Sequence, residues 1–518
     1  MKDKSILHPF ILPLLPILNL AVNNAGQVSI EKVIYPSLVY LSATGILFGI
    51  IWLLNRNLNR SAMITTLLVV LFFSYGRLFE VVWMWGFFDQ MKTLNLVLAL
   101  VFCGSWLGAA ILLWRTPRNL KPLGSFLTVT FSVLAVFLLG KLAMVGFSSQ
   151  KVIAHSTSGS GQELTYEAIP PIFDDRENLP DIYYIILDGY ARSDVLESVY
   201  GFDNIDFVNS LRNKGFYVAE ESWSNYPLTF LSLASSLSMR YLDEEINALT
   251  ETYGAETKKR SPIFYRLIRK PKIVEILKSK GYRYATVLTN WAGTGKTFSA
   301  DITYDCNPII GGEFYSVLLR TTALRALVPS MAEMHLFTLK KIEEMPAVKG
   351  PTFTFAHVLL PHNPYVFDRH GNEKANIPMT LGFDDKTGGW RNREGYVDQM
   401  RFLNKRLEEL VDRIINNSPV RPIIIFQADH GSATTEFDAP DREEPLASER
   451  LAVFNAYFVP EEMKSRLYPG ITPVNTFRIL LSTQFQVDYQ PLPDRLYYSW
   501  YDQPYNLQDV TDSLSKSK

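Results

Sequence analysis

The stretch Ile182-Tyr-Tyr-Ile-Ile-Leu-Asp188-Gly189 is a short apolar run that ends in a carboxylate and a glycine. Four later apolar runs have a similar length and character: residues 282–288, 352–359, 422–427 and 455–459. Patterns typical of helices lie between these runs, for example at residues 205–214, 272–280 and 395–416. Strands that alternate with helices predict an α/β domain, in which helices cover both faces of a mostly parallel sheet.

A second stretch of the same design is Ile423-Ile-Ile-Phe-Gln-Ala-Asp429-His430-Gly431, in which an apolar run ends in adjacent carboxylate and imidazole side chains. In parallel α/β sheets, ligands bind beyond the carboxyl ends of the strands. Carboxylate and imidazole together suit a borderline cation such as zinc or manganese. Asp188 alone is explained equally well by a turn or a helix cap, so the metal hypothesis rests on finding both signals in one domain.

Hydroxyl side chains are dense in Ser224-Asn-Tyr-Pro-Leu-Thr229-Phe-Leu-Ser232-Leu-Ala-Ser-Ser, where a loop gives way to an apolar helix. A hydroxyl at a helix N-terminus is usually a cap. It can also be a nucleophile, because metal coordination lowers its pKa and the first amides of the helix face an incoming anion. The residues alone leave both readings open.

Two of the seven histidines lie close together in Phe355-Ala-His357-Val-Leu-Leu-Pro-His362-Asn-Pro-Tyr365. Isolated histidines are more often structural than catalytic. Because this pair follows a predicted strand of the same sheet, either imidazole is well placed to reach a bound oxyanion or a metal.

The first 147 residues differ sharply from the rest in composition. They hold 11 Lys and Arg and 4 Asp and Glu, whereas residues 148–518 hold 40 and 48. Apolar stretches of roughly the 20 residues that a bilayer requires recur there: residues 6–22, 34–54, 61–78, 93–114 and 122–146. This pattern predicts a transmembrane domain over residues 1–147. The first stretch is the weakest, because three prolines interrupt it, and it could be kinked or re-entrant.

Positive residues in short loops predict the orientation of the spans. They precede span one and lie between spans two and three and between spans four and five: Lys2, Lys4, Arg56, Arg60, Arg115, Arg118 and Lys121. With five spans, the N-terminus is expected to be cytoplasmic and the chain after about residue 147 extracytoplasmic. A linker is expected over residues 148–180 and a catalytic domain over residues 181–518. The soluble part lacks a basic excess, so nucleic acid is not expected as a partner.

In this order, the motifs resemble the alkaline phosphatase superfamily: Asp188-Gly, Thr229, a His-x4-His pair and Asp429-His430-Gly. The best match within it is the sulfatase-like branch of membrane-bound phosphoethanolamine and phosphoglycerol transferases, which includes the lipoteichoic acid synthases. The resemblance implies five N-terminal spans followed by an extracytoplasmic catalytic domain.

The resemblance also implies roles for single residues. Asp188 matches the first metal ligand, which is often Glu in those transferases, and Asp429 and His430 match the remaining ligands. Thr229 matches the metal-bound nucleophile, with Ser232 as the fallback. The implied cofactor is a divalent metal, zinc or manganese.

Two further histidines acquire implied roles. His362 matches a histidine that contacts the transferred group or a second metal, and His357 matches a neighbouring position of less defined role. Asp368 and His370 are weaker candidates for a second metal site, since no complete second ligand set is evident.

One departure narrows the expected reaction. Sulfatases carry Cys-x-Pro-x-Arg or Ser-x-Pro-x-Arg at the nucleophile, whereas this chain has Thr229-Phe-Leu-Ser-Leu, so sulfate-ester hydrolysis is not expected. The resemblance implies transfer of a phospho-headgroup from a phospholipid donor to an envelope glycan or lipid acceptor through a covalent threonine intermediate. The alternatives are a phosphoester hydrolase on the same scaffold and a non-catalytic envelope protein that binds lipid or glycan.

Overall fold

A computed structural model describes residues 4–24, 28, 30–85, 87–88, 91–158, 179–254, 262–308, 313–374, 389–435 and 447–515. The chain divides into two compact units. Among the described residues, the helical unit comprises the chain up to residue 158 together with residues 313–329. The α/β unit comprises the described residues of 179–308 and 330–515.

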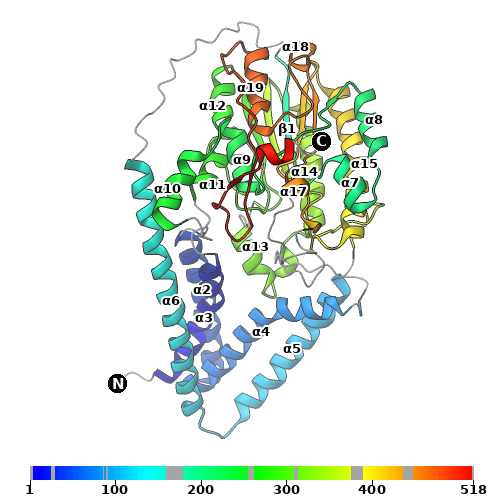
Figure 1. Ribbon diagram of the computed structural model, residues 1–518. Helices are drawn as coiled ribbons and strands as arrows, with labels where there is room; N and C mark the ends of the chain where they lie inside the picture. Colours follow the sequence, from blue (N-terminus) through cyan, green and yellow to red (C-terminus); the bar gives the residue numbers. More distant parts are fainter. Residues whose placement is uncertain are drawn as a thin grey trace. The chain divides into compact units, whose positions relative to one another are not determined.

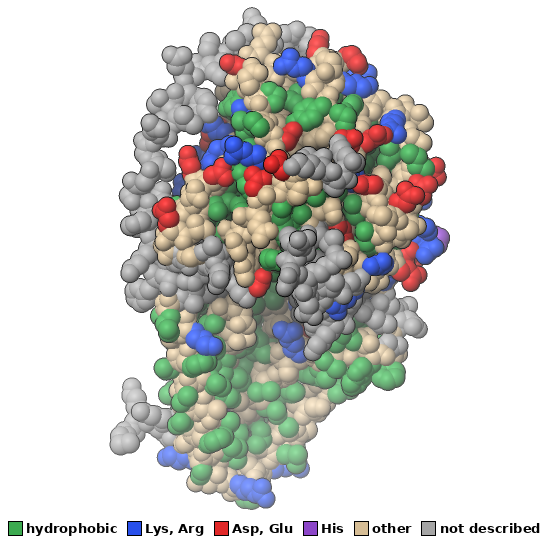
Figure 2. Space-filling view, viewed as in Figure 1, with side chains coloured by type: hydrophobic (Ala, Val, Ile, Leu, Met, Phe, Trp, Pro, Cys, Tyr) green, Lys and Arg blue, Asp and Glu red, His purple; other side chains and the backbone are tan. Residues whose placement is uncertain are grey.

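Four long helices dominate the helical unit: α3 (Ile30–Asn55), α4 (Leu58–Met84), α5 (Met91–Arg115) and α6 (Lys121–Ser158). All four are long and apolar enough to cross a membrane, by length and composition. Their outward surfaces carry mainly apolar side chains, which Figure 2 shows in green. The apolar stretches predicted at residues 34–54, 61–78, 93–114 and 122–146 fall on these helices.

The first predicted span, residues 6–22, is broken into short pieces, which agrees with the kinked form that its three prolines suggested. It consists of a short turn and two short helices: η1 (Lys4–Ile6), α1 (His8–Ile11) and α2 (Leu14–Asn23). Pro13 occupies the N-cap position of α2. Proline has no backbone N–H to donate to the preceding turn, which accounts for the break.

The boundaries of the two units depart from the simple division by residue number. Helix α6 continues to Ser158, inside the range 148–180 for which a linker is predicted. Most of the rest of that range, residues 159–178, lies outside the described residues. Residues 313–329, which fall within the predicted catalytic domain, group with the helical unit.

The α/β unit is built on a seven-stranded sheet. Its strands are β1 (Ile182–Leu187), β2 (Tyr217–Val218), β3 (Arg283–Val287), β4 (Ile302–Tyr304), β5 (Thr352–Val358), β6 (Ile423–Gln427) and β7 (Asn455–Phe458). They lie in the order β2-β7-β6-β1-β5-β3-β4, and β7 runs in the direction opposite to that of the other six strands. The predicted mostly parallel α/β fold is therefore confirmed.

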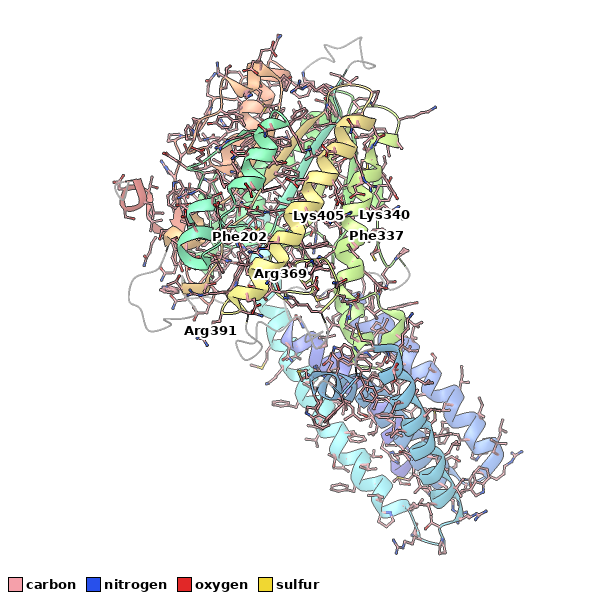
Figure 3. The ribbon with its side chains drawn as sticks, turned by 90° about the vertical axis from the view of Figure 1, so that its right-hand side faces the viewer. Phe202, Phe337, Lys340, Arg369, Arg391 and Lys405 are labelled. Atoms are coloured by element: carbon pink, nitrogen blue, oxygen red, sulfur yellow. The ribbon has the colours of Figure 1, made fainter. Side chains whose placement is uncertain are left out.

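Helices cover both faces of this sheet (Figure 1). One face packs against α7 (Ser193–Tyr200), α8 (Ile205–Asn213), α14 (Met331–Glu344) and α15 (Arg393–Asn417). The other carries α9 (Thr229–Ser238), α12 (Lys272–Ser279) and α19 (Pro473–Gln484), with α11 (Pro262–Arg269) against α9. Figure 3 shows Lys340 on α14 beside Lys405 on α15, which are neighbouring helices of the first face.

Shorter elements complete the description of the α/β unit. They are α10 (Asp243–Tyr253), η4 (Met345–Ala347), α17 (Ala447–Leu451), α18 (Glu461–Lys464), β8 (Tyr497–Tyr498), β9 (Gln508–Asp509) and α20 (Thr511–Ser515). The strands β8 and β9 pair in a separate small sheet.

The register of the three central strands positions the candidate site. Every residue of β1 is buried, as expected of a strand covered on both faces. Ile186 of β1 pairs with His357 of β5 and with Gln427 of β6. The carboxyl ends of β5, β1 and β6 are thus level, and the residues that follow β1 and β6 leave the same edge of the sheet.

Candidate active site

Asp188 follows β1 and is fixed by backbone hydrogen bonds on both sides. Its amide donates to the carbonyl of Val358 at 3.0 Å, and its carbonyl accepts from the amide of His362 at 3.0 Å. Gly189 comes next, with a φ of 72°. A Cβ there would lie 2.8 Å from the ring of Trp390, so both the backbone angle and the space require glycine.

Asp429 and His430 follow β6 and converge on Asp188. The amide of Gly189 donates to Oδ1 of Asp429 at 3.1 Å. Nε2 of His430 lies 3.5 Å from Oδ1 of Asp188 and 3.3 Å from Oδ2 of Asp429. Nδ1 of His430 lies 2.9 Å from the carbonyl of Gly431. We assign the proton to Nδ1, since a carbonyl only accepts, which leaves the Nε2 lone pair facing the two carboxylates.

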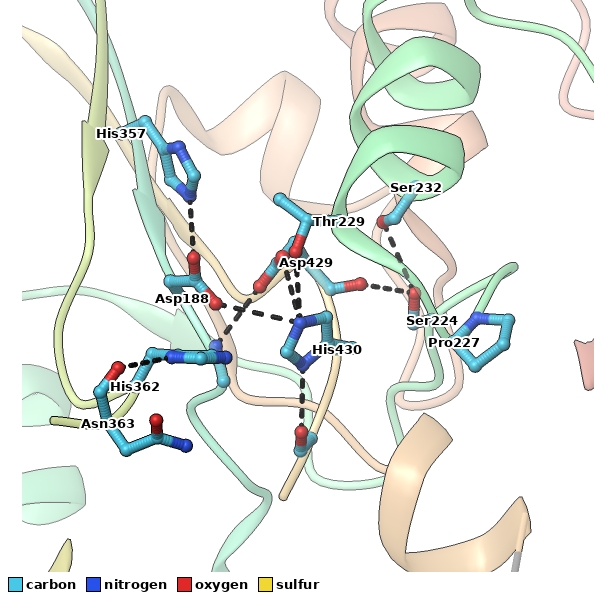
Figure 4. Close-up of polar contacts among 12 residues, drawn as sticks. Asp188, Ser224, Pro227, Thr229, Ser232, His357, His362, Asn363, Asp429 and His430 are labelled. Atoms are coloured by element: carbon cyan, nitrogen blue, oxygen red, sulfur yellow. Dashed lines mark hydrogen bonds and ion pairs between the residues drawn. The ribbon is translucent and has the colours of Figure 1, made fainter. Parts of the chain in front are cut away.

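Thr229 is the first residue of α9, and its hydroxyl faces this cluster (Figure 4). Its Oγ1 lies 3.1 Å from Nε2 of His430. The N-cap position belongs to Leu228, so Thr229 does not occupy the capping position. Ser232, one turn further along, is buried, and its Oγ lies 3.3 Å from Oγ of Ser224.

His357 and His362 lie on either side of Asp188. Nε2 of buried His357 is 3.1 Å from Oδ2 of Asp188, and its Nδ1 is 3.2 Å from the hydroxyl of Thr294. Nδ1 of His362 lies 2.7 Å from the carbonyl of Asn363, and its ring centre is 6.1 Å from that of His430. His362 is only half-buried, so it is the more accessible of the two.

Two overlapping groups of side chains have the chemistry of a metal site. They are Asp188 with His362 and His430, and Asp188 with His357 and Asp429, and the ligand atoms within each group lie within 4.8 Å of one another. Oδ1 of Asp188 and Oδ2 of Asp429 are buried and accept no hydrogen bond from the described residues. Two carboxylate oxygens and an imidazole lone pair facing one another repel, and a divalent cation between them removes that cost.

The charges in the cluster are perturbed in directions that suit this arrangement. Burial alone would raise the pKa of Asp188, but the imidazoles of His362 and His357 outweigh it and hold that pKa well below its usual range. Burial and the adjacent charge of Asp188 raise the pKa of Asp429 to about 7. Burial and the nearby guanidinium of Arg450 lower the pKa of His430, so its imidazole is neutral and available as a ligand.

The family model for sulfatases, described as Sulfatase, matches residues 180–477, which is more than half of the chain. The chain belongs to the Sulfatase family. It is accordingly an enzyme of the sulfatase-like group. A search of curated proteins found no significant match.

Several solved structures resemble the chain. The C-terminal periplasmic domain of EptC from Escherichia coli has 11% identity and a TM-score of 0.43, covering 67% of this chain and 96% of that one. The same domain of the phosphoethanolamine transferase EptC from Campylobacter jejuni has 13% identity and a TM-score of 0.39, covering 60% and 92%. The lipoteichoic acid synthase LtaP from Listeria monocytogenes has 11% identity and a TM-score of 0.39, covering 61% and 77%.

Two weaker candidates of the sequence analysis lie apart from this cluster in the sulfatase-like domain. Asp368 accepts from the amides of His370 and Asn372 at 2.8 and 2.9 Å and so closes a local turn, while the His370 side chain is exposed. Within the part of the chain that the structure describes, neither residue belongs to a group able to hold a metal.

Sequence reasoning missed two adjacent residues of the sulfatase-like domain, Glu449 and Arg450. Arg450 is buried; its Nε donates to the carbonyl of Pro227 at 2.8 Å, and its Nη1 donates to that of Gly431 at 3.1 Å. It thereby joins the turn before Thr229 to the loop after His430. A charged pair in a polar stretch carries no motif, so nothing in the sequence marked it.

Glu449 fixes the loop that follows the Asp429-His430 pair. One carboxylate oxygen accepts from the hydroxyl of Ser432 at 2.6 Å and from the amide of Thr434 at 2.7 Å, and the other accepts from the amide of Thr435 at 2.9 Å. Ser224, which lies in the predicted hydroxyl-rich segment, donates to the carbonyl of Asp429 at 2.5 Å. These contacts hold the segment of the predicted nucleophile and the predicted metal ligands in one rigid frame.

Proposed function

We propose that this protein is a metal-dependent transferase that moves a phospho-headgroup from a membrane lipid to a glycan or lipid of the cell envelope. The observation that carries the proposal is the position of Thr229. Its hydroxyl lies at the N-terminus of a ten-residue helix, 3.1 Å from the neutral imidazole of His430 and beside two buried carboxylates. A hydroxyl so placed lies beside the candidate metal ligands and at a helix terminus that favours an incoming anion.

We assign the metal to Asp188, Asp429, His430 and the hydroxyl of Thr229, with His357 and His362 as ligands of a second ion or as substrate contacts. Carboxylate and imidazole donors fit zinc or manganese. A divalent cation bound there would lower the pKa of the Thr229 hydroxyl and offset charge on the phosphoryl oxygens.

The reaction proceeds in two displacements at phosphorus. The Thr229 hydroxyl loses its proton to solvent and its oxygen attacks the headgroup phosphate. The bond to the diacylglycerol oxygen breaks, and a phosphothreonine diester forms. An acceptor hydroxyl then attacks the same phosphorus, and the Thr229 oxygen leaves. Half-buried His362 is placed to donate a proton to the first leaving group and to remove one from the acceptor. The headgroup is of the phosphoethanolamine or phosphoglycerol type.

The helical unit supports action on a lipid, and we propose that it crosses the membrane five times. Ser5 donates to Asn59 at 2.8 Å, and its carbonyl lies against Gly124, so the chain begins near the starts of α4 and α6. At the other end, Ala21 packs in one cluster with Val33, near the start of α3. The broken segment α1–α2 therefore runs from one end of the bundle to the other, as a crossing segment does.

The positive residues support an orientation of the helical unit. Arg56 and Arg60 lie where α3 meets α4, and Arg115, Arg118 and Lys121 lie where α5 meets α6. Both connections are at the end of the bundle where the chain begins. By the positive-inside rule that end is cytoplasmic, and the sulfatase-like domain is extracytoplasmic, in the periplasm or outside the cell.

The experiment is peptide mass spectrometry of the full-length protein after incubation with vesicles of phosphatidylethanolamine and phosphatidylglycerol and with Zn²⁺ or Mn²⁺. We expect a phosphoethanolamine or phosphoglycerol adduct on the peptide that contains Thr229, and none in Thr229→Ala. Headgroup release that requires an added acceptor supports a transferase, whereas release at the same rate in water alone identifies a hydrolase. Normal turnover by Thr229→Ala would overturn the mechanism.

A further inference from the structure

A segment of the chain that lies between two elements of the sulfatase-like domain belongs to the helical unit. It comprises α13 (Glu313–Arg320) and η3 (Arg325–Leu327), and it falls between β4 and α14 in the sequence (Figure 1). Phe314 and Leu318 of α13 are buried in one apolar cluster with Ile17 and Leu18 of α2. Side chains of the segment therefore form part of the buried apolar core of the helical unit.

The following residues insert into the hydrogen-bond ladder of α4. The amide of Gly76 donates to the carbonyl of Thr321 at 3.1 Å, and the carbonyl of Phe72 accepts from the amide of Ala323 at 3.0 Å. Phe72 and Gly76 are four residues apart, so these are two groups that an α-helix pairs with each other. Residues 321–323 thus pair with the backbone of a helix that is long enough to span a membrane.

Two features make this docking specific. A Cβ at Gly76 would collide with backbone atoms of Arg320 and Thr321, so the close approach requires glycine. The guanidinium of Arg325 is buried, donates to the carbonyl of Gly76 at 3.1 Å and lies 3.5 Å from the ring centre of Phe79. The cation and the polar backbone are thereby satisfied inside the protein, which is the condition for irregular chain at membrane depth.

The outer side of the segment is apolar and exposed. Leu327 is 65% exposed and Leu324 is 40% exposed, on either side of buried Arg325. Helix α4 also exposes Leu78 and Val81 at its outer surface. Leucines exposed in this way beside the apolar surface of a spanning helix match the acyl chains of a lipid better than water.

We infer that residues 313–329 are a lipid-embedded insert of the catalytic chain, clamped to α4 at Gly76, with Leu324 and Leu327 in the acyl region of the bilayer. The inference rests on α4 crossing a membrane and is independent of the transferase proposal. Its consequence is that the catalytic chain returns to the bilayer after leaving it at α6.

The test uses the full-length protein without its two native cysteines (Cys103→Ala, Cys306→Ala) in phosphatidylcholine nanodiscs. A single cysteine carries a fluorophore, and doxyl-labelled phosphatidylcholine quenches it. Leu327→Cys is the test position, Val136→Cys on the exposed face of α6 is the lipid reference, and Glu462→Cys on the exposed side of α18 is the water reference. We expect Leu327→Cys to be quenched about as strongly as Val136→Cys and several-fold more than Glu462→Cys. Quenching no greater than at Glu462→Cys would overturn the inference.

A second pair of variants tests the clamp with the same readout. Gly76→Ala adds the colliding Cβ, whereas Gly45→Ala in α3 adds one into open space. In the Leu327→Cys protein, we expect Gly76→Ala to reduce lipid quenching several-fold and Gly45→Ala to leave it unchanged. Equal quenching in both would show that the close approach at Gly76 does not hold the insert.

Discussion

Oγ1 of Thr229 and Nε2 of His430 lie 3.1 Å apart although 201 residues separate them in the sequence. The start of α9 and the end of β6 meet at the same edge of the sheet, and the Arg450 side chain ties the two loops together. A hydroxyl, a neutral imidazole and two carboxylates are thereby held in reach of one another before any substrate binds.

Replacing Thr229 by alanine is expected to lower kcat/KM for headgroup transfer by about 10³-fold or more, because the attacking oxygen is lost. Thr229→Ser keeps an oxygen and should retain a measurable fraction of the rate. The matched control is Ser232→Ala, whose hydroxyl is buried against Ser224. Steady-state kinetics decide the matter; loss of turnover in Ser232→Ala with retention in Thr229→Ala would assign the nucleophile to Ser232.

Asp429→Asn and His430→Gln are expected to empty the proposed metal site. Loss of a residue that merely hydrogen-bonds to a metal ligand typically lowers metal affinity by about 10–100-fold. Loss of a ligand itself should lower the affinity by at least as much. Asp206→Asn, an exposed carboxylate on α8, is the control and should bind metal normally. Metal content of the purified proteins by plasma mass spectrometry measures the effect, and stoichiometric metal in Asp429→Asn would contradict the assignment of that ligand.

Arg450→Gln should lower kcat by about 10-fold or more while changing KM little, since Arg450 positions Thr229 and His430 and is buried behind them. Arg450→Lys should restore only part of the rate, because the lysine ammonium can donate well to one of the two carbonyls but not to both. Arg421→Gln serves as the control, because Arg421 precedes β6 and is exposed, with its guanidinium over the ring of Phe458 in β7. Equal rates for Arg450→Gln and Arg421→Gln would exclude a positioning role.

Because His335 on α14 is buried, we expect the protein to lose stability against unfolding in acid. Burial lowers the pKa of His335 to about 4, although the charge of Asp188 acts in the opposite direction. The unfolded chain binds a proton below pH 6.5 and the folded chain only below about pH 4, so stability falls as pH falls through this window. The full effect is about 3 kcal/mol at most.

His335→Gln should therefore make the unfolding temperature of the nanodisc-embedded protein less sensitive to the change from pH 7 to pH 5. His370→Gln, at an exposed histidine, should leave that sensitivity as it is. If both variants respond to acid like the parent protein, another group controls acid unfolding.

The sequence predicted which residues meet at the candidate site because its signals are local. An apolar run before Asp188 and another before Asp429-His430 predict two strands that end in ligands, and parallel strands place such ends at one edge. For the same reason, four of the five predicted membrane segments coincide with long helices. The first did not, because the prolines that interrupt its apolar pattern also break the helix.

Only the tertiary structure showed which of the predicted residues contact one another and which further residues hold them in place. It placed Thr229 beside His430 and showed Arg450 and Glu449 holding their loops, and it grouped residues 313–329 with the helical unit. No periodicity records these relationships, since each depends on side chains and backbone groups that are distant in the chain. Composition and hydrophobic pattern determine which segments are buried, whereas the partner of a buried polar group is determined by packing.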